Sequence, residues 1–425
     1  MEPKISVVMP IYNSQRYLRQ AVESILGQTF IDFELLAFNN ASTDQSREIL
    51  DEYAAADSRV HIYDQPDREY IFALIKGFSL ASGAYIARMD ADDVARPERL
   101  GLQFAFMESH PEIALIGGQI MAIDGQGNDI RLIDFPLQDE EIRKILPRYN
   151  CFSHPAVMLR KAAYDAVGGY RLAFYYAEDY DLWLRLSEKF ALANLPEVIL
   201  NYRVHVEQVS ASRRDQQIVS AIGAQYAAQC RKVGKPDPTD GLERISPEHL
   251  STWGISPSTI NKFHMEEDIW WSRLLFEAGN TQPAQAILES ALARSPLRSL
   301  ETEQAQRAAN TYIQLYSSPD NPLYNFGRTL YTGIRQPLIL KKTIQSIPQR
   351  LLQLGGAEKI VGEGFSERNN GNYIKAYRLF HLAVKKNPLY LFNKGVLSVL
   401  VESLIGRSRM KRFHSSKSHN GNPLP

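Results

Sequence analysis

Residues 84–93 read AYIARMDADD, a short apolar run that ends in a cluster of aspartates. Similar apolar runs alternate with helical patterns from residue 5 to about residue 120, and the first of them is residues 5–11. Strands that alternate with helices predict βαβ units and a largely parallel sheet. We therefore expect an α/β fold in which residues 84–89 form a strand and the aspartates lie at its carboxyl end.

Asp90, Asp92 and Asp93 place several like charges within four residues. Open α/β sheets bind ligands at the carboxyl ends of their strands, and a divalent cation shared with phosphate oxygens would offset the repulsion there. The cluster therefore predicts a site for Mn²⁺ or Mg²⁺ and a phosphate-bearing ligand. An alternative is a solvated acidic turn that caps the helix beginning at Pro97.

Length and composition limit the classes of function. The chain has 425 residues, beyond the ~250–300 at which single cores stop growing, so two domains are expected. Lys plus Arg and Asp plus Glu both total 48, which gives no basic surplus for nucleic acid. The start resembles no signal peptide, no apolar run is long enough for a bilayer, and the two cysteines fit reduced thiols. We expect a cytoplasmic protein with no nucleic-acid partner.

The character of the sequence changes near residues 235–241, which read KPDPTDG and are typical of a linker. We predict a catalytic α/β domain at 1–232, a linker at 233–248 and a mostly α-helical region at 249–405. The tail at 406–425 is basic and lacks apolar periodicity, so we expect it to be disordered.

The helical region contains a weak internal repeat. Gly279-Asn280, Ala284, Ala291 and Pro296 recur 92 residues later, at 371–372, 376, 383 and 388. Small residues at these positions let two helices pack closely, and the pattern resembles a tetratricopeptide unit. Such a region would bind a protein partner or a membrane surface, which suggests peripheral attachment at the inner face of the membrane.

Several motifs over about residues 1–225 resemble family 2 glycosyltransferases in order and spacing. They are VVMPIYN at 7–13, QTF at 28–30, ASTD at 41–44, YIARMDADD at 85–93, SHP at 153–155, GGY at 168–170, EDYDLW at 178–183 and YRVH at 202–205. The resemblance implies a GT-A-type fold, in which a Rossmann-like nucleotide-binding sheet is joined to an acceptor-binding part. It also implies inverting transfer of a sugar from a nucleoside diphosphate donor.

The resemblance assigns roles to single residues. Those matched to the nucleotide site are Pro10, Tyr12, Asn13, Asn40 and Asp90. Asp92 and His205 match the site of the cofactor, Mn²⁺ or Mg²⁺, with an ordinary surface histidine as the alternative for His205. Those assigned to an acceptor or donor pocket are His154, Glu178 and Trp183, and for His154 the alternative is a structural hydrogen bond.

Asp179 is the candidate catalytic base, which would take the proton from an acceptor hydroxyl. Apolar residues three, four and seven positions later share its helical face, so we expect Asp179 to point inward. Glu178, Asp181 and Arg185 share another face, on which Asp181 and Arg185 are expected to pair and remain solvated. The alternative for Asp179 is a helix-start acid stabilised by the helix dipole.

The sequence departs from the family pattern at two places. Asn39-Asn40 stands where paired aspartates often contact the base and ribose, and Ile75 replaces a frequent asparagine. These changes affect the expected donor specificity, although the amide of Asn40 can still bond a uracil edge. The Gln-x-x-Arg-Trp motif and the membrane helices of processive members are absent from the sequence, which favours transfer of one sugar at a time.

The sequence therefore predicts a non-processive, inverting hexosyltransferase that uses a nucleotide sugar, UDP-linked, and acts on a glycan or lipid-linked acceptor in cell-surface polysaccharide biosynthesis. One alternative is a catalytically silent nucleotide-sugar-binding or scaffold protein. Another is a sugar nucleotidyltransferase, which usually carries a Gly-rich triphosphate loop that is not visible after the first strand.

Overall fold

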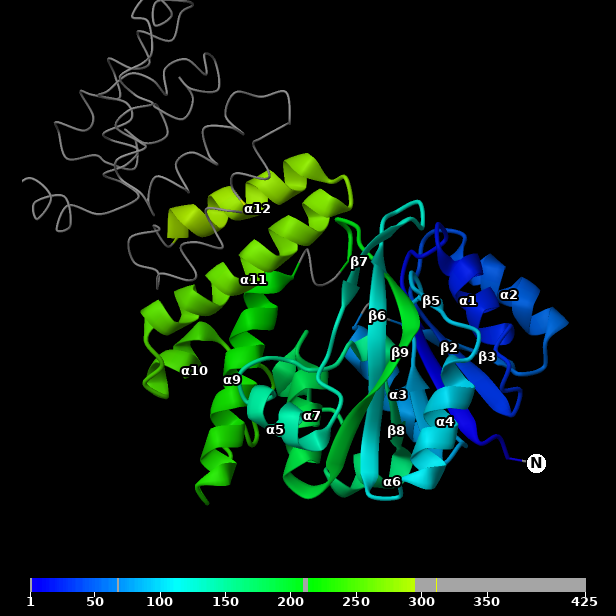
Figure 1. The fold of residues 1–425 in the computed structure, drawn as a ribbon, viewed down its shortest axis with the longest axis horizontal. Coiled ribbons are helices and arrows are strands. Elements are labelled where there is room, and N and C mark those ends of the chain that lie inside the picture. Colours follow the sequence, from blue (N-terminus) through cyan, green and yellow to red (C-terminus); the bar gives the residue numbers. More distant parts are fainter. Residues whose placement is uncertain (1, 67–68, 209–212, 295–310, 312–425) are drawn as a thin grey trace, which may run out of the picture. The chain divides into compact units, whose positions relative to one another are not determined.

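The computed structural model describes residues 2–66, 69–208, 213–294 and 311 (Figure 1). The chain divides into two compact units. One comprises Met1–Ile260 with Glu277–Gly279, and the other comprises Asn261–Phe276 with the residues from Asn280 onward. The predicted domain boundaries stay predictions, and the predicted basic tail at 406–425 lies outside the described residues.

Four strands of the first unit form a parallel half-sheet. β1 (Ile5–Ile11) lies between β2 (Phe33–Asn40) and β4 (Tyr85–Arg88), and β3 (Val60–Gln65) pairs with β2 at the edge. Every residue of β1 and β2 is buried, as expected for parallel strands that are covered on both faces. The predicted α/β fold is confirmed here, including the strand that ends in the aspartates.

Three helices connect these strands, α1 (Leu18–Leu26), α2 (Ser46–Ala56) and α3 (Tyr70–Leu80). The apolar side chains of α1 recur at helical spacing, and one face of the helix is buried against the sheet. A fully buried aliphatic side chain of this kind stabilises a fold by about 1.5–3 kcal/mol. Hydrophobic periodicity therefore sets the order of strand and helix that brings four strand ends to one edge.

Beyond β4 the sheet is mixed, which corrects the expectation of a largely parallel sheet. β8 (Met158–Arg160) runs antiparallel to β4 and to β6 (Ile113–Ile123), and β6 pairs in parallel with β9 (Ala191–Arg203). Two short strands, β5 (Val94–Ala95) and β7 (Asp129–Ile133), run antiparallel to β9 and β6. The reversal arises because β8 lies antiparallel between β4 and β6.

The remaining helices of the first unit follow β4 in the chain. They are α4 (Arg99–Ser109), α5 (Asp139–Ile145), α6 (Lys161–Ala166), α7 (Glu178–Lys189), α9 (Arg214–Lys232) and α10 (Pro247–Thr252), with 3₁₀ turns η1 (His154–Ala156) and η2 (Leu172–Phe174). Helix α9 packs on both α7 and η2. It therefore supports the segment that carries the candidate base.

The Pro- and Gly-rich segment at 233–248 is fixed to the first unit rather than extended away from it. Asp237 forms an ion pair with Arg171 at 2.9 Å. Ile245 is fully buried, and its N–H donates to the carbonyl oxygen of Ala173 at 3.0 Å. Turn-forming residues thus shape a packed connection here, and its assignment as a linker between domains stays a prediction.

In the second unit, α11 (Pro257–Glu277) and α12 (Thr281–Arg294) lie side by side and are joined by a side-chain hydrogen bond (Figure 1). Ala284 and Ala291 are buried, as the close packing of small residues predicts. The corresponding repeat at 371–388 lies outside the described residues, and the tetratricopeptide assignment stays a prediction. Of the helices that the structure describes, none has the length and apolar character to cross a membrane.

The contact of α3 with the sheet yields a test of packing. A Cβ on Gly77 would lie 2.5 Å from Val8 Cγ1 and 2.9 Å from Phe38 Cε2. Overpacking of this kind typically destabilises by about 1–3 kcal/mol. We expect Gly77→Ala to lower the free energy of unfolding by that amount in urea denaturation.

The matched control is Gly101→Ala in α4. Its added Cβ would meet its nearest neighbours at 3.8 Å, an ordinary contact distance. Because alanine favours a helix over glycine by up to about 1 kcal/mol, this change should leave stability unaltered or raised. Equal losses in both variants would contradict the close approach of α3 to β1.

Candidate active site

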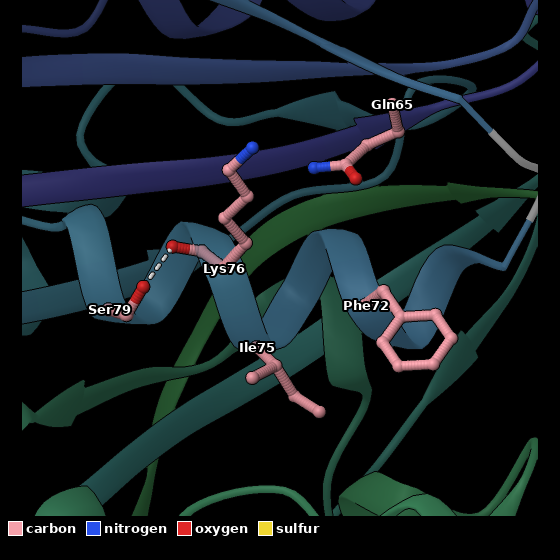
Figure 2. A pocket seen from close by; sticks show the side chains of 5 residues that line it. All are labelled: Gln65, Phe72, Ile75, Lys76 and Ser79. Carbon is pink, nitrogen blue, oxygen red and sulfur yellow. Dashed lines mark hydrogen bonds between the residues drawn. The ribbon is translucent and has the colours of Figure 1, made fainter.

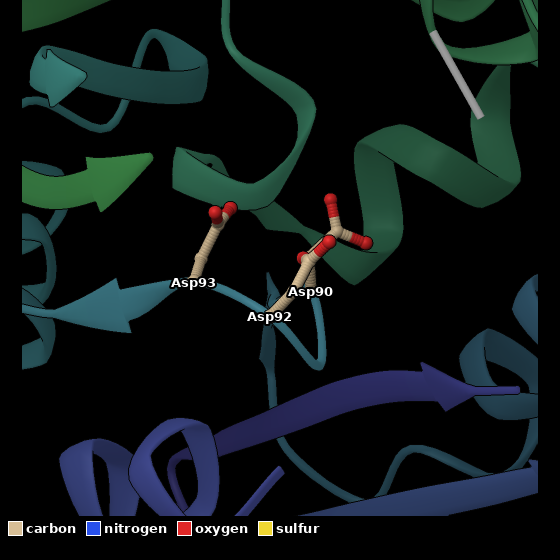
Figure 3. A group of neighbouring side chains, drawn as sticks. All are labelled: Asp90, Asp92 and Asp93. Carbon is tan, nitrogen blue, oxygen red and sulfur yellow. The ribbon is translucent and has the colours of Figure 1, made fainter. Parts of the chain in front are cut away.

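The aspartates after β4 form the acidic cluster that the sequence predicts. One carboxylate oxygen from each of Asp90, Asp92 and Asp93 lies within 4.8 Å of the others (Figure 3). Asp90 and Asp92 are partly buried, and Asp93 is fully buried. Burial, followed by the charges of the neighbouring aspartates, raises the pKa of Asp93 well above its usual value. The cluster therefore concentrates negative charge that a cation can relieve.

Arg203, at the end of β9, holds the loop of the acidic cluster in place, a role that the sequence did not reveal. Its backbone N–H donates to Asp93 Oδ1, and its Nε donates to the carbonyl oxygen of Asp92, both at 2.8 Å. A further bond reaches Gln20 Oε1 at 2.6 Å, and the guanidinium lies 4.4 Å from the ring centre of Tyr17. The only sequence signal is the place of Arg203 in the motif YRVH.

His205 lies beside the acidic cluster. Its Nε2 is 2.8 Å from Asp92 Oδ2, and its ring is tilted against that of Tyr17 with centroids 5.5 Å apart. The structure thus brings together the two residues predicted to hold the metal. Their assignment as metal ligands stays a prediction. His205 contacts the cluster directly, so it is not a surface histidine remote from the site.

The residues after β1 and β2 are linked to each other. Asn13 has a φ of 47°, its N–H donates to Ser42 Oγ at 3.1 Å, and its Oδ1 accepts the N–H of Thr43 at 2.8 Å. Pro10 is buried in β1, and Tyr12 is 37% exposed. Two loops at the carboxyl edge therefore form one surface, which leaves the Tyr12 ring accessible.

Asn39 and Asn40 have different surroundings. Asn39 Nδ2 donates to Asp64 Oδ1 at 2.8 Å. The carboxylate of Asp64, from β3, therefore lies next to residue 39, where the family pattern often has an aspartate. Asn40 is 1% exposed, and its Oδ1 is buried with no hydrogen-bond partner in the described part of the chain. A buried amide oxygen without a partner is unusual in a folded protein.

A shallow pocket of about 480 Å³ lies between the end of β3 and α3 (Figure 2). It is lined by Gln65, Phe72, Ile75, Lys76 and Ser79. Phe72 and Ile75 project from one side of the helix, and Lys76 projects on the side of Gln65. The departure at Ile75 therefore makes this pocket more apolar than an asparagine would.

Two carboxyls lie at the start of α7. Glu178 is 2% exposed and accepts a hydrogen bond from the Tyr70 hydroxyl. Asp179 is partly buried, and its Oδ2 accepts a bond from Asn150 Nδ2 at 3.0 Å. Burial, with the charge of Asp179, raises the pKa of Glu178 to about 8, and burial raises that of Asp179 to about 6. The contacts of Tyr70 and Asn150 were not foreseen from sequence.

The prediction of a solvated face on α7 is wrong. Glu178, Asp181 and Arg185 are all buried, at 2%, 0% and 7% exposure. Asp181 is paired with Arg185 at 2.7 Å and also with Arg171. The cause is tertiary, because η2 and α9 cover the side of α7 that faces away from the sheet. Helical periodicity shows which residues share a face but not whether another element covers it.

His154 and Trp183 support the start of α7. His154 Nε2 is hydrogen-bonded to the Tyr170 hydroxyl at 2.8 Å, and Nδ1 lies 3.7 Å from Glu178 Oε1. Burial lowers the pKa of His154 well below its usual value, so the ring is neutral. Trp183 is fully buried and packs edge-on against this ring. His154 therefore contacts Glu178, and Trp183 packs behind His154 rather than lining the predicted pocket.

The strand order of the sheet indicates where a ligand binds. The strand order β3-β2-β1-β4-β8 changes direction at β1 and β4, and open α/β sheets bind ligands at such a point, outside the carboxyl ends of the strands. Asn13 and Asn40 flank it on one side, and the acidic cluster lies at the end of β4. The guanidinium of Arg88, the last residue of β4, forms an ion pair with Asp90 at this edge.

Comparisons with known proteins define the class. The family model described as glycosyl transferase family 2 matches residues 6–168. The chain is 36% identical over 212 residues to the O-antigen biosynthesis glycosyltransferase WbnJ of Escherichia coli, covering 49% of this chain and 82% of WbnJ. This chain therefore belongs to glycosyltransferase family 2, and its fold is the α/β fold of GT-A type expected for that family.

Another relative has a similar match. The amylovoran biosynthesis glycosyltransferase AmsE of Erwinia amylovora is 32% identical over 212 residues, covering 49% of this chain and 79% of AmsE. Among solved structures, residues 1–349 of S. aureus TarS in complex with UDP-GlcNAc give a TM-score of 0.45 at 16% identity, covering 79% of this chain and 92% of that chain. The family membership favours sugar transfer over the nucleotidyl-transfer alternative.

Arg203 provides a test of the site. Arg203→Met removes the bonds that fix the backbone at Asp92 and the neighbouring loop, and bonds of a charged donor are typically worth about 1.5–3 kcal/mol each. We expect UDP–Mn²⁺ affinity, measured by calorimetry, to fall by at least about tenfold.

The control is Arg160→Met. Arg160 donates to the Tyr85 hydroxyl and to three carbonyl oxygens near the amino end of β4, at the opposite edge of the sheet. This variant should lose stability and keep its nucleotide affinity. If both variants lost affinity equally, Arg203 would have only a general structural role.

Proposed function

We propose that this protein is an inverting hexosyltransferase that uses a nucleoside diphosphate sugar, UDP-linked, and transfers one sugar at a time. The observation that carries the proposal is the acidic cluster after β4, in which the carboxylate oxygens of Asp90, Asp92 and Asp93 lie within 4.8 Å of one another and His205 Nε2 lies 2.8 Å from Asp92. Transfer needs a site for the diphosphate and a nearby base. Membership of family 2 supports the same reaction class.

The donor nucleotide lies across the carboxyl ends of β1, β2 and β4 in this proposal. Residues assigned to it are Pro10, Tyr12, Asn13, Asn40 and Asp90. The diphosphate belongs at the acidic cluster and the sugar belongs beside Asp179, so the nucleoside extends the other way, toward β1 and β2. The buried amide oxygen of Asn40 can accept the N3–H of uracil there.

The acidic cluster fits a divalent cation. Asp90 and Asp92 are partly exposed carboxylates close enough to share one ion, while Asp93 is engaged by Arg203. Asp92 and His205 would hold the ion. A carboxylate together with an imidazole suits Mn²⁺, and carboxylates alone suit Mg²⁺. When bound, the ion would offset negative charge on the departing diphosphate.

Asp179 acts as the base. The acceptor oxygen forms its bond to the anomeric carbon from the face opposite the diphosphate, and its proton passes to the Asp179 carboxylate. The bond from the anomeric carbon to the diphosphate oxygen breaks, and its electron pair leaves with the diphosphate. This single displacement inverts the anomeric configuration. Glu178, whose pKa is raised to about 8, stays protonated at neutral pH, so Asp179 is the carboxyl that can accept the proton.

The acceptor is a hydroxyl of a glycan or lipid-linked saccharide in a cell-surface polysaccharide. The relatives WbnJ and AmsE carry biosynthesis of O-antigen and of amylovoran in their names, which supports this choice. We place the enzyme in the cytoplasm, peripherally at the inner face of the membrane, with the helical region after residue 249 as its contact to a membrane or protein partner. A catalytically silent scaffold is disfavoured, because such a protein has no need for the paired acids of α7.

Metal dependence gives one test. We expect calorimetry to show UDP binding in Mn²⁺ and a loss on the order of tenfold or more in EDTA or in Asp92→Ala, because the diphosphate and the acids otherwise repel each other. Asp129→Asn, an exposed acid on β7, is the control and should bind as the parent does. Equal affinity in EDTA and Mn²⁺ would remove the metal from the donor site.

Asp179→Asn gives a second test. The variant should fold and bind UDP normally but lose about 10²–10⁴ in transfer rate, because the amide cannot accept the proton. Asp165→Asn on α6, whose side chain is exposed, is the control and should keep full activity. Loss of less than about threefold would leave Asp179 with the structural role of a helix-start acid.

The pH profile follows from the same residue. A base with a pKa of about 6 is mostly ionised at pH 7 and is protonated as the pH falls, so the parent rate should decline on the acid side of about pH 6. Initial rates between pH 4.5 and 8 would show this. A rate that rises toward low pH would contradict a carboxylate base.

A further inference from the structure

Tyr176 has an unusual backbone conformation, with a φ of 66°. A bulky side chain seldom occupies this left-handed region, and residues strained in this way are found mainly at active sites and ligand clamps. Within the part of the chain that the structure describes, the only other non-glycine residues with a positive φ are Asn13 and Ala41, in the loops after β1 and β2. Those two lie at the edge proposed for the donor, which leaves the strained turn at Tyr176 to be explained.

The turn places the ring of Tyr176 against Tyr70 at the start of α3. The two rings are stacked, with centroids 5.8 Å apart and an angle of 11° between their planes. The Tyr70 hydroxyl donates to Glu178 Oε2, so the same ring pair is tied to the start of α7. Both tyrosines are partly exposed. An aromatic pair therefore lies in contact with Glu178, the residue before Asp179.

Tyr175 and Tyr176 are consecutive but have different surroundings. The ring of Tyr175 lies 3.9 Å from the guanidinium carbon of Arg244, and its hydroxyl is hydrogen-bonded to Glu69. Tyr175 also meets the Tyr176 ring at an angle of 70°, with centroids 6.1 Å apart. The Tyr176 hydroxyl, in contrast, has no hydrogen bond to any residue that the structure describes. Neighbouring rings thus hold Tyr176 in place and leave its hydroxyl open.

Polar groups that can bond a sugar lie at the same start of α7. Asp179 Oδ2 accepts a hydrogen bond from Asn150 Nδ2 at 3.0 Å, and Asn150 is exposed. Carboxylate, amide and phenol groups can each bond a sugar hydroxyl, while an aromatic ring covers the apolar C–H face of a pyranose. The combination of stacked rings with these polar groups is the chemistry that recognises a saccharide ring.

We propose that Tyr176 and Tyr70 form the acceptor subsite, on which the sugar that receives the new bond lies with its reacting hydroxyl directed to Asp179. The inference rests on the proposed role of Asp179 as the base. The ligand is a pyranose with an accessible apolar C–H face, at the end of a glycan or lipid-linked saccharide.

The strained turn explains how one short segment presents both the ring and the base. Tyr176 lies two residues before α7, which begins with Glu178 and Asp179. The contacts of Tyr175 with Glu69 and of Tyr176 with Tyr70 hold the turn, as a strained backbone requires. A sugar on the ring pair therefore meets Asp179 in a constant geometry, and such positioning is a large part of the rate of a transfer reaction.

The test measures saccharide binding to the full chain by saturation-transfer difference NMR. The probes are methyl β-D-glucopyranoside, methyl β-D-galactopyranoside and methyl N-acetyl-β-D-glucosaminide, each with UDP and Mn²⁺ present. The parent should show transfer to the ring C–H protons of at least one probe. Because glycine adopts a positive φ without steric cost, Tyr176→Gly removes the ring and keeps the turn, and it should lower that signal by about fivefold or more.

Matched variants make the result specific. Tyr176→Phe keeps the ring and should retain most of the signal. Tyr53→Leu is the control, because Tyr53 is a partly buried tyrosine of α2 whose hydroxyl bonds Glu23 Oε1 of α1 at 2.7 Å, and it should bind the probes as the parent does. Asparagine also tolerates the left-handed region, so Tyr176→Asn replaces Tyr176→Gly if that variant fails to fold.

Three results would overturn the proposal. They are a parent signal in the folded Tyr176→Gly or Tyr176→Asn protein, a signal in Tyr176→Phe as low as that in Tyr176→Gly, and no signal in the parent with any probe. Repeating the measurement with UDP-2-fluoroglucose or UDP-2-fluorogalactose in place of UDP distinguishes acceptor from donor sugar. The signal should persist, and its displacement by these donors would place the ring pair at the donor sugar and reject an acceptor subsite.

Calorimetry of UDP with Mn²⁺ separates this inference from the proposed function. Tyr176→Gly should bind UDP with the affinity of the parent, because the ring pair lies at the start of α7 rather than at the acidic cluster. Normal UDP binding by a parent that gives no saccharide signal would reject the subsite and leave the proposed function standing. A saccharide signal in a parent that binds no UDP would reject the proposed donor and leave the subsite standing.

Discussion

Mutual repulsion among carboxylates at the end of β4 is the constraint on which the site depends. Asp90, Asp92 and Asp93 bring their oxygens within 4.8 Å of one another, at an edge that is partly buried. The protein offsets the repulsion with fixed groups, and Arg203 holds the loop while His205 contacts Asp92. The remaining negative charge is what makes the edge suited to a divalent cation and a diphosphate.

The mixed half of the sheet supplies the second part of the site. Strand β9 brings Arg203 and His205 back to the carboxyl end of β4, and α7 presents Asp179 from a helix buried on nearly all sides. Buried ion pairs of Asp181 with Arg171 and Arg185 anchor that helix, and Asp237 extends the network into the segment after α9. Removing one partner of a buried ion pair typically destabilises a folded protein by about 3–5 kcal/mol, so these pairs hold α7 firmly in place. A helix held in this way can keep a base at a fixed position near a reacting centre.

Local periodicity was sufficient to predict the first four strands, the helices between them and the aspartates at a strand end, because these depend on neighbours in sequence. The predictions that failed depend on contacts between distant segments. Asp181 looked solvated because nothing local reveals that η2 and α9 cover it. Arg203 carried no distinctive local pattern, since its partners Asp92, Asp93 and Gln20 are contributed by other elements.

The stereochemistry of the first turnover tests the account most directly. An α-linked nucleotide sugar that the enzyme hydrolyses or transfers is followed by ¹H NMR, and the coupling constant of the anomeric proton is read before the product can equilibrate. A single displacement with Asp179 as base requires a β-configured first product. A first product that keeps the α configuration would contradict direct attack and with it the assigned role of Asp179.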